Sequence, residues 1–198
     1  MPKNFIENWF KKKSWKLHDH QIKMIESGAL GLSTLLIAPT GGGKTLAGFL
    51  PSIIELNADP TNSLHTIYIS PLKALTVDVA RNLLDPLSEM DLKITVETRT
   101  GDTPQSKRQQ QRKSPPNILL TTPESLGLLL SSKKFREHFR RTRYIILDEI
   151  LPGEKIIDDD SLINYCKKMI KTNWHPVGTC KMGNDNDRLA VLNSKLQV

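Results

Sequence analysis

The sequence predicts an α/β fold in which a parallel sheet is flanked by helices, followed by a short tail of mixed α and β character. Over the first 150 residues, short apolar runs alternate with longer helical patterns, and a glycine-rich loop joins the first run to the helix after it. Such alternation is typical of βαβ units, whose crossover helices cover both faces of a parallel sheet. The 198 residues are enough for one domain with a small annex.

Five strands are expected, each of four to six residues rich in Ile, Leu, Val or Thr and bounded by polar or turn residues. They cover residues 33–38, 64–69, 92–97, 117–121 and 144–147. Helices are expected at residues 18–27, 44–56, 73–87, 104–111 and 124–130. In the 73–87 segment, Leu75, Val79, Leu83 and Leu87 recur every fourth residue, which predicts one apolar stripe.

Residues 150–198 do not continue this rhythm. Pro152 and Gly153 predict a turn, and Asp158, Asp159 and Asp160 predict the start of a helix that runs to Lys171. Two parts are therefore expected, residues 1–149 and residues 150–198. The second is expected to pack poorly, because some fifty residues rarely build a core alone.

Composition favours some classes of partner and cellular compartment and excludes others. The formal net charge is +7, from 28 Lys and Arg against 21 Asp and Glu. This charge fits a polyanionic partner such as nucleic acid, and a solvated basic face without a partner explains it equally well. No apolar stretch is long enough to span a membrane, and Met1 is followed by no apolar signal segment. The two cysteines, Cys166 and Cys180, cannot form a disulfide framework, so a reducing cytoplasm is expected.

The strongest motif is a glycine-rich loop between an apolar run and a helix. It reads Ala38-Pro39-Thr40-Gly41-Gly42-Gly43-Lys44-Thr45. Glycines allow backbone N–H groups to point at phosphate oxygens, and the helix N-terminus adds partial positive charge. Lys44 is expected to reach the β- and γ-phosphates of a nucleotide and Thr45 to hold Mg²⁺. Ala38 stands where the P-loop pattern has its first glycine, and a glycine-rich hairpin is the structural alternative.

The last predicted strand ends in two acids, Asp148 and Glu149. Asp148 is expected to act on Mg²⁺ through its water shell, and Glu149 to polarise the attacking water. A solvated acidic loop is the alternative, which the presence of the upstream phosphate loop disfavours.

Residues 6–149 resemble the first RecA-like domain of a superfamily 2 DExH-box helicase, most closely the Lhr-like group and its ligase-associated DNA-damage-response helicases. The resemblance is carried by six segments in order. They are residues 15–21, the phosphate loop, Ser70-Pro71-Leu72-Lys73-Ala74-Leu75, Arg99-Thr100-Gly101-Asp102-Thr103, Thr121-Thr122-Pro123-Glu124-Ser125-Leu126 and Leu147-Asp148-Glu149. The domain would then be truncated after the Walker B strand at 144–147.

The resemblance also implies binding residues. Gln21 would read the adenine edge, beside the phosphate loop formed by Thr40, Gly41, Gly42, Gly43, Lys44 and Thr45. The backbone of a nucleic acid, DNA rather than RNA, would contact Lys73, Arg99, Thr100, Gly101, Thr122, Pro123 and Glu124.

Structural alternatives remain open for several of these residues. Gln21 and Lys73 could be surface helix residues, Thr122 and Pro123 make an ordinary helix start, and Trp9 and Trp15 are more often packing anchors than stacking platforms.

After Glu149 the helicase pattern stops, and residues 149–198 resemble the C-terminal part of a glucose-methanol-choline (GMC) flavin oxidoreductase. The specific part reads Asn173-Trp174-His175-Pro176-Val177-Gly178-Thr179-Cys180-Lys181-Met182-Gly183. The resemblance implies that His175 acts as a catalytic base beside FAD. No G-x-G-x-x-G dinucleotide motif occurs in the chain, so His175 is expected to be a stranded motif residue.

Three hypotheses follow. The first is an ATP- and nucleic-acid-binding fragment of a DExH-type DNA helicase that does not unwind alone and hydrolyses weakly, since the second RecA-like domain and its arginine fingers are missing. The second is an FAD-dependent alcohol oxidoreductase represented by its C-terminal fragment. The third is an inactive hybrid of two truncated genes. The oligomeric state is not indicated by the sequence.

Overall fold

The computed structural model describes residues 4–38 and 41–148. The chain divides into two units, Met1–Ile150 and Leu151–Val198, and all described residues belong to the first. The predicted helix starting at Asp158, the packing of the tail and the position of His175 therefore lie outside the described residues.

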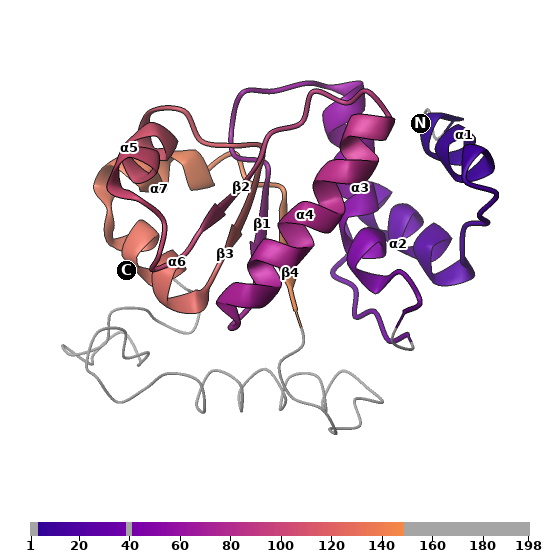
Figure 1. Ribbon diagram of the computed structural model, residues 1–198, viewed down its shortest axis with the longest axis horizontal. Helices are drawn as coiled ribbons and strands as arrows, with labels where there is room; N and C mark the ends of the chain where they lie inside the picture. The colour runs from indigo at the N-terminus through magenta and orange to yellow at the C-terminus, as the bar shows by residue number, and fades with distance from the viewer. Residues whose placement is uncertain (1–3, 39–40, 149–198) are drawn as a thin grey trace. The chain divides into compact units, whose positions relative to one another are not determined.

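The sheet is parallel and has four strands in the order β2-β3-β1-β4 (Figure 1). The strands are β1 (Thr66–Ile69), β2 (Val96–Arg99), β3 (Ile118–Thr121) and β4 (Tyr144–Leu147). In register, Thr66 of β1 lies opposite Ile118 of β3 on one side and Tyr144 of β4 on the other. The predicted α/β class with a helix-flanked parallel sheet, as in a RecA-like domain, is confirmed.

Seven helices lie in the described part of the chain. They are α1 (Asn4–Lys12), α2 (Asp19–Ala29), α3 (Lys44–Ala58), α4 (Lys73–Glu89), α5 (Gln105–Lys113), α6 (Pro123–Ser131) and α7 (Lys133–Phe139). The five predicted helices are present within three residues of their expected ends. Helices α1 and α7 were not predicted from the sequence.

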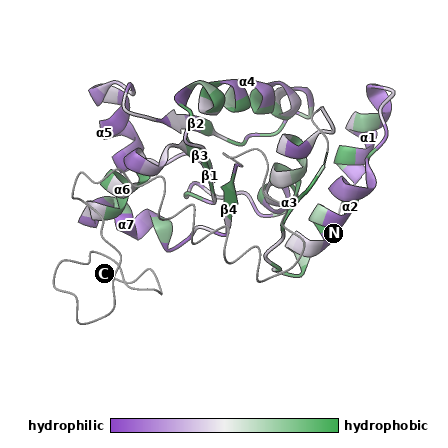
Figure 2. Ribbon diagram, turned by 90° about the horizontal axis from the view of Figure 1, so that it is seen from below, coloured by the Kyte–Doolittle hydropathy of each residue, from purple (hydrophilic) through white to green (hydrophobic). Residues whose placement is uncertain are grey.

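Two apolar cores cover the two faces of the sheet. On one face, α3 and α4 pack their apolar stripes on β1 and β3, with Phe49, Ile53, Val79 and Leu83 buried. On the other face, Phe135 of α7 and Leu129 of α6 pack on Leu119. Figure 2 shows the strands with α4 on one side of the sheet and α6 and α7 on the other. Burial of this kind is the main stabilising term of a domain.

A third apolar cluster attaches α1 to α2 and α3. Ile6, Trp9 and Phe10 fall at helical spacing and are buried against Ile25 and Leu50. Trp9 is thus a packing anchor, as predicted, and its indole N–H donates to Glu89 at 2.7 Å. Trp15 packs less completely than Trp9: it is 57% exposed, and its ring contacts that of Trp9 edge-on.

The predicted strand at 33–38 is wrong. These residues form no strand, and Leu35 and Ile37 are 45% and 71% exposed. A strand requires a hydrogen-bonded neighbour, and within the described residues β4 pairs with β1 alone, so the apolar run has no partner. The strand predicted at 92–97 begins later, at Val96.

Candidate functional site

The glycine-rich loop leads directly into helix α3, whose first residue is Lys44. Gly41 and Gly43 have φ values of +82° and +70°, a left-handed conformation that strains any residue with a Cβ. The turn therefore depends on glycine at these positions. Thr40 lies outside the described residues. Lys44 is half-buried at the helix start and Thr45 is exposed beside it.

Helix α2 braces this loop through two neighbouring side chains. Gln21 is 2% exposed, its Oε1 accepts from the backbone N–H of His18 at 3.0 Å, and its Nε2 donates to Gly43 O at 3.4 Å. The ring Nε2 of His20 lies 2.7 Å from Gly42 O. Gln21 is thus a loop-positioning residue in this structure, and its predicted adenine contact stays a prediction. The sequence analysis missed His20, whose only signal was its place beside Gln21.

The orientation of α3 brings its N-terminus to the carboxyl end of β4. Glu55, near the end of α3, accepts from Tyr144 Oη at 2.8 Å and pairs with Arg143 Nε at 3.0 Å, at the beginning of β4. Earlier in α3, Gly48 lies against Ile146, so closely that a Cβ there would sit 3.4 Å from Ile146 Cγ2. The helix therefore runs antiparallel to β4.

Lys44 and Asp148 consequently extend toward the same end of the domain. Lys44 precedes Gly48 by one helical turn, about 6 Å at 1.5 Å per residue, and Asp148 follows Ile146 by two strand residues, about 7 Å. The helix N-terminus, its lysine and the carboxylate thus lie at one edge of the sheet.

Asp148 is held by Tyr68 of β1. The Tyr68 hydroxyl donates to Asp148 Oδ2, and its ring is buried in the core. Burial raises the pKa of Tyr68, and the hydrogen bond to Asp148 and the carboxylate charge raise it further. The sequence analysis missed Tyr68, although a hydroxyl in the apolar run Thr66–Ile69 was a visible signal. Glu149 lies outside the described residues.

The predicted nucleic-acid residues follow the carboxyl ends of three strands of the same sheet. Lys73 follows β1, the 99–103 segment follows β2, and Thr122, Pro123 and Glu124 follow β3. Because the carboxyl ends of parallel strands meet at one edge, this arrangement places the segments on the same edge as Asp148.

These side chains are not equally available. Lys73 is 55% exposed in its side chain and its Nζ lies 3.1 Å from both oxygens of Asp102. Gly101 is exposed, while Thr100 is buried and its N–H donates to Thr103 Oγ1 at 2.9 Å. Glu124 is exposed at the start of α6.

Arg99 faces inward. It is 6% exposed, and its Nη1 donates to Gln111 Oε1 at 3.1 Å and Arg108 O at 3.3 Å. Burial lowers the pKa of Arg99, and the charges of Arg108 and Arg112 lower it further. Direct contact of Arg99 with nucleic acid remains a prediction. In this structure its hydrogen bonds to Arg108 and Gln111 hold α5 against the 99–103 segment.

Thr122 caps α6, as the structural alternative expected. Its Oγ1 accepts from Ser125 N at 3.4 Å, with Pro123 at the first turn. The nucleic-acid contact of Thr122 stays a prediction.

The residues present fit a nucleotide with Mg²⁺. Gly41 is exposed, and the loop ends at the N-terminus of α3, where free backbone N–H groups and the partial positive charge of the helix favour a phosphate. Mg²⁺ keeps several waters and needs only one or two protein oxygens besides the phosphates; Thr45 carries a hydroxyl oxygen at the start of α3, and the Asp148 carboxylate is available to the water shell of the ion. Within the described residues no group of three or more His, Cys, Asp or Glu could hold a metal by itself. None of the described helices has the length and apolarity to cross a membrane.

Comparison with known proteins agrees with this geometry. A family model described as DEAD/DEAH box helicase matches residues 18–170. The chain is 41% identical over 160 residues to the ATP-dependent helicase Lhr-Core of Methanothermobacter thermautotrophicus, covering 74% of this chain and 19% of the relative. It is 45% identical over 133 residues to the Lhr helicase/probable uracil glycosylase of Mycolicibacterium smegmatis, covering 61% and 9%.

Solved structures show the same likeness. The Mycobacterium smegmatis helicase Lhr bound to ssDNA and AMP-PNP matches with a TM-score of 0.68 and 42% identity, over 74% of this chain and 20% of that one. The DUF1998 helicase MrfA bound to DNA and AMPPNP matches with a TM-score of 0.67 and 32% identity, over 75% and 21%. The chain therefore spans about a fifth or less of the length of these relatives.

The comparisons give no support to the GMC oxidoreductase resemblance of residues 149–198, with its base His175 and FAD. The helicase model extends to residue 170 instead, beyond the end of the predicted helicase part. With a parallel sheet, a glycine loop entering α3 and an acid at the end of β4, the chain belongs to the DEAD/DEAH box helicase family.

Proposed function

We propose that the chain binds ATP with Mg²⁺ at the start of α3 and binds DNA along the carboxyl edge of its sheet, as the first motor domain of a helicase does. The observation that carries the proposal is the antiparallel packing of α3 on β4, which directs Lys44 and Asp148 to one edge. The relatives bound to AMP-PNP or AMPPNP together with DNA support the pairing of these two ligands.

Each residue has a distinct role in nucleotide binding. Loop N–H groups and Lys44 bind and orient the phosphates, and Gln21 and His20 hold the loop in the receptive conformation. Thr45 and Asp148 would hold Mg²⁺, which neutralises phosphate charge when bound. Tyr68 fixes the Asp148 carboxylate. Activation of water is assigned to Glu149, on the resemblance alone.

DNA rather than RNA is proposed because the nucleic-acid complexes among the solved structures above 30% identity contain DNA. The exposed Lys73 and the loop backbones would contact phosphates, which positions a strand without reading its sequence. Such contacts weaken as salt rises, because bound counterions are released.

Nucleotide binding is tested with a fluorescent ATP analogue and Mg²⁺. Lys44→Ala removes a charge-assisted contact worth about 1.5–3 kcal/mol, so affinity should fall about 10- to 150-fold. Lys23→Ala, an exposed lysine of α2, is the matched control and should bind like the unaltered chain. Equal affinity of the two variants would refute the site.

DNA binding is tested by anisotropy with a labelled single strand over a range of salt. Lys73→Gln should weaken binding and lower its salt dependence, because a phosphate contact is lost. Lys93→Gln is the control, since Lys93 is exposed and precedes β2, at the opposite edge of the sheet. Binding that is insensitive to salt would contradict the proposed interface.

A further inference from the structure

The strongest concentration of positive charge lies away from the proposed site, on α5 and α7. Helix α5 and residues 131–143 together carry ten Lys and Arg but only one acid, Glu137. Subtracting them from the totals of 28 and 21 leaves 18 basic against 20 acidic residues elsewhere. The net positive charge of the protein thus resides in this basic surface, defined as α5 plus residues 131–143.

The two segments form one surface. The ring Nε2 of His138 on α7 lies 3.1 Å from Arg112 O at the end of α5. Figure 1 shows α5, α6 and α7 gathered beside the β2 edge of the sheet, with α1 and α2 at the other end of the described domain. The polarity of α5 is visible in Figure 2, where most of the helix is hydrophilic.

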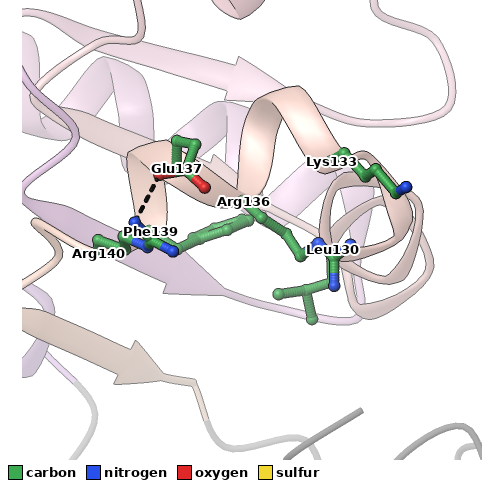
Figure 3. Close-up of a pocket in the computed structure, with 6 residues that line it drawn as sticks. All are labelled: Leu130, Lys133, Arg136, Glu137, Phe139 and Arg140. Carbon is green, nitrogen blue, oxygen red and sulfur yellow. Dashed lines mark ion pairs between the residues drawn. The ribbon is translucent and has the colours of Figure 1, made fainter.

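A shallow pocket of about 620 Å³ opens in this surface (Figure 3). Lys133, Arg136 and Arg140 line it, together with Glu137 and the apolar side chains of Leu130 and Phe139. Arg140 Nη1 pairs with Glu137 at 2.9 Å, while Lys133 and Arg136 make no ion pair with any residue that the structure describes. Like charges left together in this way repel one another, which an anionic partner would relieve.

The spacing of these cations suits a nucleic-acid backbone. Lys133, Arg136 and Arg140 follow one another at three- and four-residue steps, so they lie along one face over about 10 Å. A double helix presents about one phosphate per 1.7 Å of its axis, or about six over this length, twice the density of a single strand. The basic surface as a whole, with ten Lys and Arg against one acid, is therefore attracted more strongly to a duplex than to a single strand.

The α5 part of the basic surface adjoins the sheet edge, since Arg108 donates to Gly101 O at 2.6 Å, and the α7 part lies farther from that edge. Helix α6 begins at Pro123, after its cap Thr122 on that edge, and its nine residues carry the chain about 13 Å before Lys133. We infer that α5 and α7 bind the phosphate backbone of duplex DNA, next to the single strand expected at the sheet edge. The inference rests on charge and geometry that the proposed ATP site does not use.

The test replaces three cations without changing side-chain shape greatly: Lys133→Gln, Arg136→Gln and Arg140→Gln in one variant. Loss of three phosphate contacts should lower the slope of log affinity against log salt by about 2.7 for a duplex of about 20 base pairs. Between about 50 and 200 mM salt, the unaltered chain would then lose roughly 40-fold more affinity than the variant. A control with the same charge change, Lys11→Gln with Lys12→Gln and Lys23→Gln on α1 and α2, should keep the original slope.

Two further measurements separate the outcomes. Unchanged binding of the ATP analogue shows that the triple variant is folded. A single strand of about five nucleotides should bind the triple variant like the unaltered chain, because the proposed function assigns single strands to the sheet edge. Equal duplex slopes for the triple variant and the control would overturn the inference, as would a greater loss for the short single strand than for the duplex. If Lys73→Gln leaves DNA binding unchanged while the triple variant shows the expected lower slope, only the sheet-edge interface is overturned.

Discussion

Gly43 and Gly31 offer a matched pair for testing how α2 braces the phosphate loop. Both residues have left-handed backbones, with φ of +70° and +67°. A Cβ at Gly43 would come within 2.7 Å of Gln21 Nε2, whereas a Cβ at Gly31 would meet nothing within 4 Å. Alanine at Gly31 therefore reports the backbone strain alone, and alanine at Gly43 adds the displacement of Gln21.

The magnitudes follow from these contacts. A left-handed non-glycine residue costs about 1–2 kcal/mol, partly offset by about 0.4–1 kcal/mol of lost unfolded-state entropy, so Gly31→Ala should destabilise by about 1 kcal/mol. Gly43→Ala also forces the buried Gln21 amide to move, which sacrifices hydrogen bonds worth about 0.5–1.5 kcal/mol each. Its total should be about 2 kcal/mol.

The assays are urea unfolding and binding of the ATP analogue. Gly31→Ala should bind nucleotide normally despite its lower stability, while Gly43→Ala should lose both stability and binding. If the two variants have the same stability and the same nucleotide affinity, the contact between Gln21 and Gly43 contributes to neither, and the proposed bracing of the loop by α2 is refuted.

Three other predictions concern single interactions. Tyr68→Phe should lower the free energy of unfolding by about 1.5–3 kcal/mol, because it removes a hydrogen bond to the Asp148 carboxylate. Burial lowers the pKa of His65 below 6.5, so as pH falls the unfolded chain takes up a proton at this residue before the folded chain does. The free energy of unfolding should therefore decline as pH falls through about 6.5, by at most about 1.4 kcal/mol per pH unit. Urea titrations should show a shallower decline in His65→Gln. Thr122→Ala should cost about 1 kcal/mol through loss of the α6 cap, and more than Ser132→Ala, whose side chain makes no capping hydrogen bond to α7.

Each of these has a contradicting result. Unchanged stability of Tyr68→Phe would mean that the hydroxyl contributes nothing at Asp148. An identical pH dependence between about pH 5.5 and 7.5 with and without His65 would contradict its buried neutral state. Equal effects of Thr122→Ala and Ser132→Ala would show that the capping hydrogen bond of Thr122 does not stabilise α6.

Local sequence patterns predicted most of the helices and strands. The predictions failed where an element depends on a partner from a distant part of the chain. The stripe from Leu75 to Leu87 and the glycine-rich loop are local signals, so their helices and turn were foreseen. Residues 33–38 carry an equally good strand pattern but have no partner to pair with among the described strands. Helix α7 was missed because its charge masked Phe135 and Phe139, which are four residues apart on one helical face.

The candidate site divides in the same way. Lys44, Thr45 and Asp148 were predicted from motifs whose chemistry is encoded locally. The contacts of Gln21 with Gly43 and of Tyr68 with Asp148 join residues 22 and 80 positions apart, and no single-sequence pattern specifies such pairs. The resemblance predicts that Arg99 contacts nucleic acid, and this stays a prediction; its burial at 6% exposed and its hydrogen bond to Gln111 of α5 could not be read from the sequence.

The central claim is that the start of α3 and the end of β4 form one ATP·Mg²⁺ site. The most direct measurement is the affinity for the ATP analogue with and without Mg²⁺ in the unaltered chain and in Asp148→Asn. We expect Mg²⁺ to strengthen binding in the unaltered chain and to have little effect in Asp148→Asn, with Lys44→Ala weak under both conditions. An equal enhancement by Mg²⁺ in Asp148→Asn and the unaltered chain would contradict the claim.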